Sequence, residues 1–574
     1  MGLMDVSNSF GYHAIASVIG GQEKHSLLEN IFQNTTTLDK VKATGLFVLS
    51  QVTTSQLFSS EIKWGSAVLG SVLALGVIAG EKWYSQQRIC RSAGLIISKD
   101  EFEGVNSSSA VRCDAFPTEH GADSELWRER LIRAAKYNIV FSGNHCGGMA
   151  FIRMLNLIEQ RMKEIPKLKV VIISSPLFIT NQEQIQRLSD EYPAQFSFIC
   201  SPDIIHISPG VKFSTNHTKG LVIDYGTHFM LGDSGVMDKF VGTGLREFPK
   251  HKFLEQRLLK GSEIESEVQR EEAVKRTEAN TYSKTGRFFG SLIGDFRSMD
   301  FVFKSNGKNK AGKYVYAQML LLCRRWEAYN DATGGNATSD ATIGIESIVK
   351  QLYRERNAIR QIDPTHLREF DESAQKCQNV AFRLFASGPE QTHSVFGKEL
   401  IKCINAAKKE IIINHMYLHL PADVMQALIE AVHRGVKIII ITGGRTKDCP
   451  KTNHIFGPRN KYNYAYLIKS LPDNLKSKVE VYEFDQSNVG LHKKVIKIDD
   501  TVIGGSSNLG YKSLESTSDH ELNFIVKSKK FAKETRRICE IDIKHSRRVS
   551  NPTVVSIYEY VHSALHRLFA WNIG

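Results

Sequence analysis

One short pattern occurs at two distant places in the chain, and this repetition limits the available folds more than any other feature. Both copies read His-x-Lys-x-x-x-x-Asp, and together they comprise His217, Lys219, Asp224, His492, Lys494 and Asp499. An apolar run joins the lysine to the aspartate in each copy, which predicts a buried β-strand. Residues two apart in a strand point to the same face, so each histidine should project beside its lysine.

The sequence around the two motifs repeats as well. Residues 124–146 and 397–418 both read as an amphipathic helix with Ala-Ala-Lys at its end, followed by an apolar strand and an Asn-His pair. A second helix and a second apolar strand follow in each case. Helices that alternate with short apolar strands indicate an α/β architecture. We therefore predict two pseudo-symmetric α/β lobes, each a mixed sheet flanked by helices.

Composition shifts suggest where the parts of the chain begin and end. We expect an N-terminal region at residues 1–110, a first lobe at 111–330, a loop and helical linker at 331–375, and a second lobe at 376–574. Residues 64–80 are apolar and uncharged, and their length is near the lower limit for a membrane-spanning helix. The alternative is a buried soluble helix. If the segment spans, the excess of positive charge after it would leave both lobes in the cytoplasm.

Charge and cysteine usage narrow the partners and the compartment. A formal net charge of +13 favours anionic partners, such as phospholipid headgroups, nucleic acids or phosphorylated small molecules. The nine cysteines occur singly, without CxxC pairs or zinc-finger spacing, so neither a disulfide scaffold nor a structural zinc is expected. Residues 554–571 carry apolar side chains at helical spacing, and we predict that this segment packs in the core rather than on a membrane surface.

A histidine beside a lysine on one face of a strand suits a phosphate group. The lysine neutralises non-bridging oxygens, and a neutral imidazole can attack phosphorus. Cleavage of a phosphodiester requires both a nucleophile and an acid for the leaving alcohol, and one lobe supplies only one imidazole. Two facing lobes would supply both. Buried structural histidines, the alternative interpretation, account poorly for two matching copies.

These motifs resemble those of the phospholipase D superfamily over roughly residues 111–572. In the second lobe, Gly-Ser-Ser-Asn at 505–508 and then Glu521 match the family's GSxN segment and its trailing acidic residue. In the first lobe, residues 232–235 read Gly-Asp-Ser-Gly and lack the asparagine, and Asp300 takes the place of the acidic residue. The resemblance implies two phospholipase D-like α/β lobes, and the apolar segment 64–80 makes the N-terminal region before them a candidate for membrane association.

The resemblance also implies roles for the residues. One histidine would form a phosphohistidine intermediate, and the other would protonate the leaving group and then activate water or an acceptor alcohol. We assign His217 as the nucleophile and His492 as the acid and base, with the lysines and aspartates of both motifs as the other catalytic residues. Supporting residues would orient the rings or hold phosphate oxygens and the motif backbone; they are Ser234, Asp300, Ser506, Asn508 and Glu521. No metal or other cofactor is expected, because the lysines and an imidazolium supply the positive charge.

Three functions remain open at this point. A lipid enzyme, hydrolysing phospholipids or transferring phosphatidyl groups as cardiolipin synthases do, fits the aspartate of both motifs and the apolar segment 64–80. A nuclease is supported mainly by charge, and a non-catalytic membrane or interaction protein only by the altered residues 232–235. We favour the lipid enzyme, with a phospholipid substrate and a membrane surface as partners and the oligomeric state left open. We expect it to be membrane-associated with cytoplasmic lobes; the alternatives are a soluble cytoplasmic protein or secretion by a non-classical route.

Overall fold

The computed structural model describes residues within the compact unit Cys90–Gly574. The described residues are 109–569, except for 176–178, 180, 202–203, 207–211, 243, 246–293, 306–310, 334–346, 357–366, 375–376, 389–393, 447 and 516–517. The predicted N-terminal region and its apolar segment 64–80 therefore lie outside the described residues. Among the helices that the structure describes, none combines the length and the apolar character needed to cross a bilayer.

The first half of the described chain alternates strands with helices. Its elements are β1 (Val111–Pro117), α6 (Gly121–Ala134), β2 (Asn138–Gly143), β3 (Cys146–Gly147), α7 (Gly148–Glu164), β4 (Lys169–Ser174), α8 (Gln182–Glu191), β5 (Phe196–Cys200), β6 (Ile204–His206), β7 (Lys212–Ser214), β8 (Gly220–Ile223), β9 (His228–Gly232), β10 (Val236–Met237), β11 (Asp295–Arg297), β12 (Asp300–Ser305) and α12 (Ala311–Thr333). Two short helices, α14 (Ile348–Glu355) and α15 (Arg368–Ala374), connect it to the second half.

The second half repeats this succession. Its elements are β13 (Val380–Ser387), α16 (Val395–Ala406), β14 (Glu410–His415), α17 (Ala422–His433), β15 (Lys437–Gly443), α18 (Lys451–Lys469), α19 (Asp473–Lys476), β16 (Val479–Phe484), β17 (Val489–Leu491), β18 (Lys494–Ile498), β19 (Thr501–Gly505), α20 (Tyr511–Leu514), β20 (Glu521–Lys527), α21 (Lys529–Lys544), β21 (Ser546–Arg548) and α22 (Ile557–Phe569).

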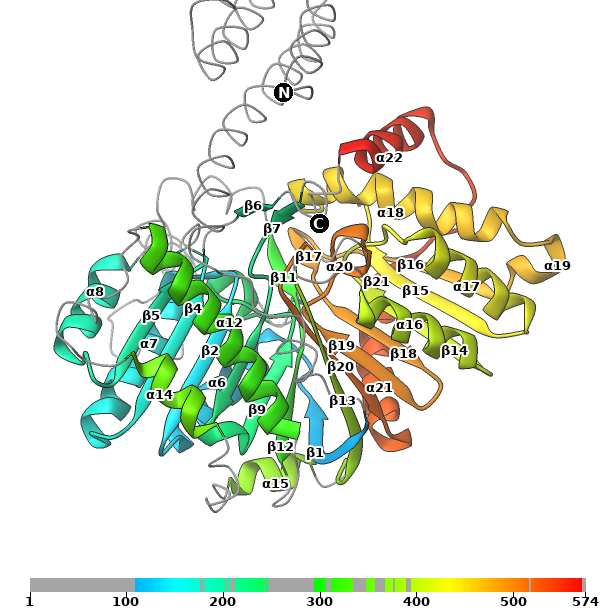
Figure 1. Ribbon diagram of the computed structural model, residues 1–574. Helices are drawn as coiled ribbons and strands as arrows, with labels where there is room; N and C mark the ends of the chain where they lie inside the picture. The colour runs from blue at the N-terminus through cyan, green and yellow to red at the C-terminus, as the bar shows by residue number, and fades with distance from the viewer. Residues whose placement is uncertain are drawn as a thin grey trace, which may run out of the picture. The chain divides into compact units, whose positions relative to one another are not determined.

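A 15-stranded mixed sheet runs through both halves (Figure 1). Its order is β21-β16-β15-β14-β18-β19-β20-β13-β1-β12-β9-β8-β2-β4-β5, so both halves follow the same order outward from the β13–β1 seam, with β21 added at one edge. The seam is antiparallel and pairs Val111 with Phe382 and Cys113 with Val380. The prediction of two pseudo-symmetric α/β lobes is confirmed, and the two lobes share one sheet.

Apolar side chains bury the central strands on both faces. In β14, Ile411 and Ile413 pack in the core formed with α16 and α17, whereas Ile412 packs in a smaller cluster with Cys539 of α21. This alternation follows from the two-residue period of a strand. Figure 1 shows α16 and α17 on one face of this half of the sheet and α21 on the other. Long apolar runs therefore predict strands covered on both sides.

The C-terminal helix differs from its prediction. Helix α22 was expected to bury its apolar side chains in the core. In the structure Ile557, Tyr558, Tyr560 and Val561 are exposed. Periodicity identified a helix with an apolar face, but it does not say which way that face points.

Candidate active site

Each motif histidine lies just before its motif strand and is held there by the backbone of the opposite lobe. The N–H of His217 donates to the carbonyl of His520 at 3.1 Å, and the N–H of His492 donates to the carbonyl of Arg297 at 2.9 Å. The residue before each histidine belongs to a short parallel pairing between the lobes, Asn216 with His520 and β17 with β11. The two crossings are equivalent under the pseudo-symmetry. Both imidazoles are therefore positioned by the junction of the lobes.

A carboxylate of the second lobe fixes the ring of His217. Its Nδ1 lies 3.0 and 3.2 Å from the two carboxylate oxygens of Glu521. The hydroxyls of Ser506 and Ser513 donate to the same buried carboxylate. When Nδ1–H donates to Glu521, Nε2 on the other edge of the ring carries the lone pair. That tautomer is the one required of a nucleophilic imidazole.

The ring of His492 has different surroundings. Its Nδ1 lies 3.4 Å from Oδ1 of Asp233, a residue of the first lobe. The rings of Phe240 and Phe296 pack around it, with centroid distances of 5.1 and 4.7 Å. The Nζ atom of Lys494 lies 3.4 Å from Nδ1 and 3.2 Å from Nε2 of this ring. The ring of His217 thus contacts a carboxylate that also accepts from two hydroxyls. The ring of His492 contacts a carboxylate at a longer distance, two aromatic rings and an ammonium group.

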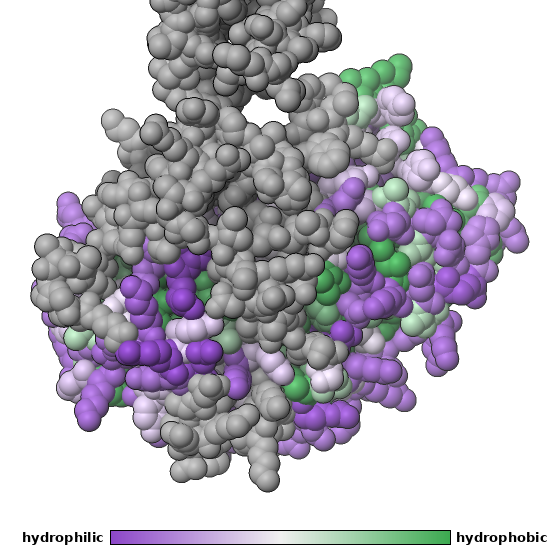
Figure 2. Space-filling model, viewed as in Figure 1, coloured by the Kyte–Doolittle hydropathy of each residue, from purple (hydrophilic) through white to green (hydrophobic). Residues whose placement is uncertain are grey.

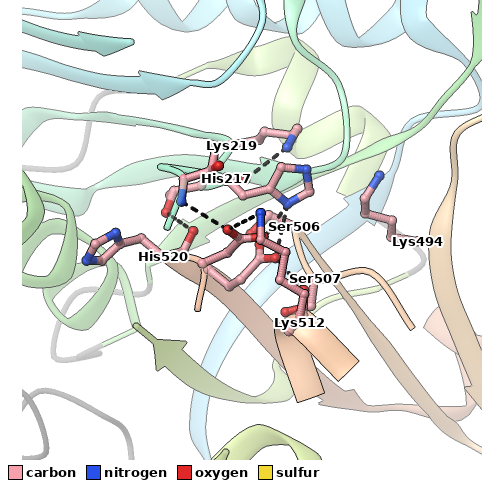
Figure 3. Close-up of polar contacts among 12 residues, drawn as sticks. His217, Lys219, Lys494, Ser506, Ser507, Lys512 and His520 are labelled. Carbon is pink, nitrogen blue, oxygen red and sulfur yellow. Dashed lines mark hydrogen bonds and ion pairs between the residues drawn. The ribbon is translucent and has the colours of Figure 1, made fainter. Parts of the chain in front are cut away.

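The motif lysines turn back toward their own histidines. Nζ of Lys219 donates to the carbonyl of His217 at 2.9 Å, and Nζ of Lys494 donates to that of His492 at 3.2 Å. Figure 3 shows the side chains of Lys219 and Lys494 on two sides of the His217 ring. Burial lowers the pKa of Lys219 to about 8, and burial together with the charge of Lys219 lowers the pKa of Lys494 to about 7. An anion bound between them would relieve this repulsion.

The electrostatics join the two motifs into one centre. Burial lowers the pKa of both motif histidines well below the ordinary value. The lysine of the opposite lobe lowers each further: Lys494 acts on His217, and Lys219 acts on His492. A third imidazole, His145, belongs to the same cluster, because burial and then Lys219 and His217 lower its pKa. Without a bound anion, these imidazoles are neutral at neutral pH.

The motif aspartates lie at the far ends of the motif strands and bind backbone. The carboxylate of Asp499 accepts hydrogen bonds from the N–H groups of residues 408–410 at 2.7 to 3.0 Å. Asp224 accepts them from residues 136–138 at 2.7 to 3.3 Å. Each aspartate thereby ties down the turn between the Ala-Ala-Lys helix and the next strand. These contacts lie at the end of each strand away from the histidine, and the catalytic role of Asp224 and Asp499 stays a prediction.

This structural role predicts a loss of stability on substitution. Partial burial raises the pKa of Asp499, but the three backbone donors lower it by more, so the ionised form is favoured in the folded state. We expect Asp499→Ala to reduce the free energy of unfolding by about 1–2 kcal/mol at pH 7, because three N–H groups lose a charged acceptor. A lowered folded-state pKa gives stability that is lost as pH falls through that pKa, so the difference should shrink under acid. Urea unfolding at pH 7 and pH 3 measures the difference in the free energy of unfolding between Asp499→Ala and the unaltered protein. The control is Asp500→Ala, at the exposed neighbouring position, which should change the free energy of unfolding little.

Asp300 does not contact a motif imidazole in the way that was expected. It begins β12 as Glu521 begins the corresponding β20. Its Oδ1 accepts the N–H of Ser234 at 3.1 Å, and its Oδ2 lies 3.6 Å from the guanidinium of Arg128. The physical reason is register: Glu521 directly follows the cross-lobe residue His520, whereas two residues separate Asp300 from Arg297.

Asp233 is the functional candidate that sequence reasoning missed. It stands second in residues 232–235, where the second lobe has Ser506. Ser506 binds the carboxylate of Glu521, whereas Asp233 reaches the ring of His492 itself. Burial raises the pKa of Asp233 well above its usual value, and the charge of Lys494 opposes that effect. The departure of residues 232–235 from the GSxN pattern was the signal available in the sequence.

If Asp233 orients His492, its removal should affect the chemical step. We expect Asp233→Asn to lower kcat by roughly 10- to 100-fold with little change in KM. Protonation of His492 favours the ionised form of Asp233 against the effect of burial, and the neutral amide stabilises that imidazolium less than the carboxylate does. The alkaline limb of the kcat profile should move to lower pH, which a purely structural role would not cause. Steady-state kinetics from pH 5 to 9 measure both, and an unshifted profile would contradict the assignment.

The remaining supporting residues have mixed positions. The hydroxyl of Ser506 donates to the carboxylate of Glu521. Asn508 and Ser234 are buried, and the Oδ1 of Asn508 and the Oγ of Ser234 have no hydrogen-bond partner among the described residues. His217, Asp519 and Glu521 lie close enough together to ligate a metal. Two buried lysines beside these groups disfavour a further cation, so the donor set fits a metal poorly.

The sequence comparisons concern mainly the second lobe. Residues 400–543 match a family model described as "Cardiolipin synthase, PLD-like domain". The chain is 27% identical over 201 residues to cardiolipin synthase A of Buchnera aphidicola subsp. Schizaphis graminum, an alignment that covers 34% of this chain and 37% of that protein. It is 26% identical over 170 residues to cardiolipin synthase 1 of Staphylococcus epidermidis, covering 29% and 31%. The chain thus spans about a third of the length of these relatives.

The structural comparison extends over both lobes. The crystal structure of phosphatidylserine synthase from Haemophilus influenzae Rd KW20 matches with a TM-score of 0.51, covering 83% of this chain and 97% of that chain at 12% identity. At this identity the match shows the fold alone. The paired motifs, the shared sheet and these comparisons together confirm the resemblance of this chain to the phospholipase D superfamily.

Proposed function

We propose that the protein is a phospholipase D-type enzyme that cleaves the phosphodiester bond of a phospholipid and passes the phosphatidyl group to an alcohol or to water. The observation that carries the proposal is the reciprocal centre, in which each lobe holds the histidine of the other. Two imidazoles can supply the nucleophile and the acid for phosphodiester exchange, and two ammonium groups can stabilise the charge on the phosphate oxygens. Similarity to proteins named cardiolipin synthase and phosphatidylserine synthase favours a phospholipid as the substrate.

In the first step Nε2 of His217 attacks phosphorus while Glu521 holds the Nδ1 proton. Lys219 and Lys494 bind the non-bridging oxygens. The single negative charge of the bound diester offsets part of the charge of the two ammonium groups and raises the pKa of His492, which can then be protonated. His492 donates this proton to the leaving alcohol oxygen as its bond to phosphorus breaks. The products are the free alcohol and a phosphatidyl group on His217.

In the second step His492, now neutral, removes a proton from water or an acceptor alcohol. The resulting oxygen nucleophile attacks phosphorus, and the bond between phosphorus and Nε2 of His217 breaks. This returns both rings to their starting states. The asymmetry of the site supports the assignment: Glu521 leaves Nε2 of His217 available for attack, whereas the ammonium of Lys494 lies beside both ring nitrogens of His492.

The test is turnover by the purified full chain on phosphatidylglycerol or phosphatidylethanolamine in mixed micelles, with a chelator present. We expect release of the headgroup alcohol, or a new phospholipid when an acceptor alcohol is added. Cleavage of DNA without lipid turnover would contradict the proposal in favour of a nuclease. Absence of turnover on either substrate, with both lipids bound, would favour the non-catalytic alternative.

A further inference from the structure

The first half of α22 has the reverse of the polarity expected for a helix on a soluble protein. Its protein-facing side chains are polar: Glu559 is 2% exposed and Ser563 is 0% exposed. Its solvent-facing side chains are apolar: Ile557 is 84% exposed and Val561 is 47% exposed. Soluble helices bury the apolar stripe and expose the polar one. Figure 2 shows hydrophobic side chains gathered over α22 at the upper right.

Tyrosine side chains extend this exposed area onto α18. The ring of Tyr462 lies 5.9 Å from that of Tyr560 on α22 and 6.3 Å from that of Tyr466 on α18. A tyrosine joins an apolar ring to a polar hydroxyl, a combination enriched where a membrane meets water. We name the set of these side chains the α22 surface: Val554, Ile557, Tyr558, Tyr560, Val561, Tyr462 and Tyr466.

A basic cavity adjoins the α22 surface. It has a volume of about 330 Å³ and is lined by residues of α18, β21 and α22, with Val554 of the α22 surface at its wall. Its charged side chains are Arg445, Lys461, Arg547, Arg548, Glu483 and Glu559. Four cations therefore face two carboxylates.

The two carboxylates of the cavity form ion pairs with its cations but neutralise only part of their positive charge. The carboxylate of Glu559 lies 2.9 Å from Arg445 and 3.0 Å from Lys461, and that of Glu483 lies 2.7 Å from Arg547. After both carboxylates are counted, a surplus of two positive charges remains, which fits an anion. None of these residues belongs to the centre formed by the two motifs. The cavity is therefore a separate site.

We propose that the α22 surface docks on an anionic lipid bilayer, with its apolar and tyrosine side chains in the interface and a lipid phosphate in the basic cavity. An amphipathic helix with its apolar face outward and basic residues beside it suits such a surface. The choice of a lipid rather than a protein partner rests in part on the proposed function. Docking itself requires no catalysis, so it can be tested separately.

The test is hydrogen–deuterium exchange of the full chain, measured at residues 554–564. A local measurement is needed because residues 64–80 could hold the chain on any bilayer. We expect vesicles containing phosphatidylglycerol to slow exchange in this segment by about fivefold or more, and phosphatidylcholine vesicles to change it little. The inactive variant His217→Ala should show the same slowing, so a failure of docking is distinguishable from a failure of the proposed function.

Two paired substitutions test the two parts of the surface. Ile557→Ser with Val561→Ser removes exposed apolar side chains, and Arg547→Gln with Arg548→Gln removes two charges from the cavity. Both pairs should abolish most of the slowing. The matched control, Lys530→Gln with Lys533→Gln, removes the same charge from exposed positions on α21 and should retain it.

Three results would overturn the proposal. The first is unchanged exchange on every vesicle. The second is equal slowing on both lipids, which would leave no role for the basic cavity. The third is slowing that depends on protein concentration without vesicles, because it would indicate that a second copy of the chain covers the α22 surface.

Discussion

Replacing His217 with alanine should lower turnover by about four orders of magnitude or more and leave no phosphorylated enzyme, because the nucleophile is lost. His492→Ala should lower turnover of a phospholipid by about 10²- to 10⁴-fold, since that substrate needs an acid for its leaving alcohol. A p-nitrophenyl diester has a leaving group that needs no proton. With it, His492→Ala should still form the phosphohistidine and then stall.

The measurement is rapid-mixing kinetics with the p-nitrophenyl diester. His492→Ala should give a burst of nitrophenolate near one equivalent and an acid-labile phosphoenzyme detectable by mass spectrometry, whereas His217→Ala should give neither. A burst in His217→Ala alone would exchange the two roles. Full activity in either variant would refute a shared centre. His433→Ala, an exposed histidine at the end of α17, is the matched control and should behave as the unaltered protein.

Replacing Lys494 with methionine should reduce activity and raise stability at the same time. The loss of one ammonium from the phosphate site should cost about 10²- to 10³-fold in kcat/KM. The expected gain in stability arises because burial and the charge of Lys219 hold the pKa of Lys494 at about 7, far below that of an exposed lysine. Methionine fills a similar volume without a buried charge, so the folded state no longer carries that cost.

The pH dependence of this gain has a definite sign. The folded state disfavours the charged lysine, so its cost is full below about pH 7 and falls as pH rises toward the unfolded pKa of about 10.4. The stability gain of Lys494→Met should therefore be larger at pH 6 than at pH 9, by on the order of 2 kcal/mol. Thermal unfolding at the two pH values measures it. Lys497→Met, on the same strand but 2.8 Å from Glu410, should destabilise instead, and a gain there would contradict the argument.

Much of this fold can be predicted from the chain because its signals are local. The helices before β2 and β14, the apolar runs of the central strands and the two-residue spacing of His492 and Lys494 depend only on neighbours in sequence. In the structure the ammonium group of each motif lysine donates to the backbone carbonyl of its own histidine. The same local pattern occurs twice in the sequence, and this repetition predicts two lobes with the same architecture.

Contacts between the lobes could not be predicted in the same way. Whether Asp233 or Asp300 meets His492 depends on the two residues that separate Arg297 from β12, which shift the register of the junction. Sequence groups the motif aspartates with the histidines as members of one motif, and the strand between them places the two ends of the motif far apart. The direction in which the apolar face of α22 points depends on the tertiary packing of this helix, which its own sequence does not determine.

The crossed backbone hydrogen bonds at His217 and His492 bear on how such a centre can evolve. When two identical chains build a centre of this kind, every substitution appears on both sides at once. In this protein both halves lie in one polypeptide, so one side can change while the other is preserved. The two halves differ in this way at Asp233, which occupies the position that Ser506 has in the second lobe. Substitutions can thus change the surroundings of one imidazole without changing those of the other, which is not possible in a homodimer.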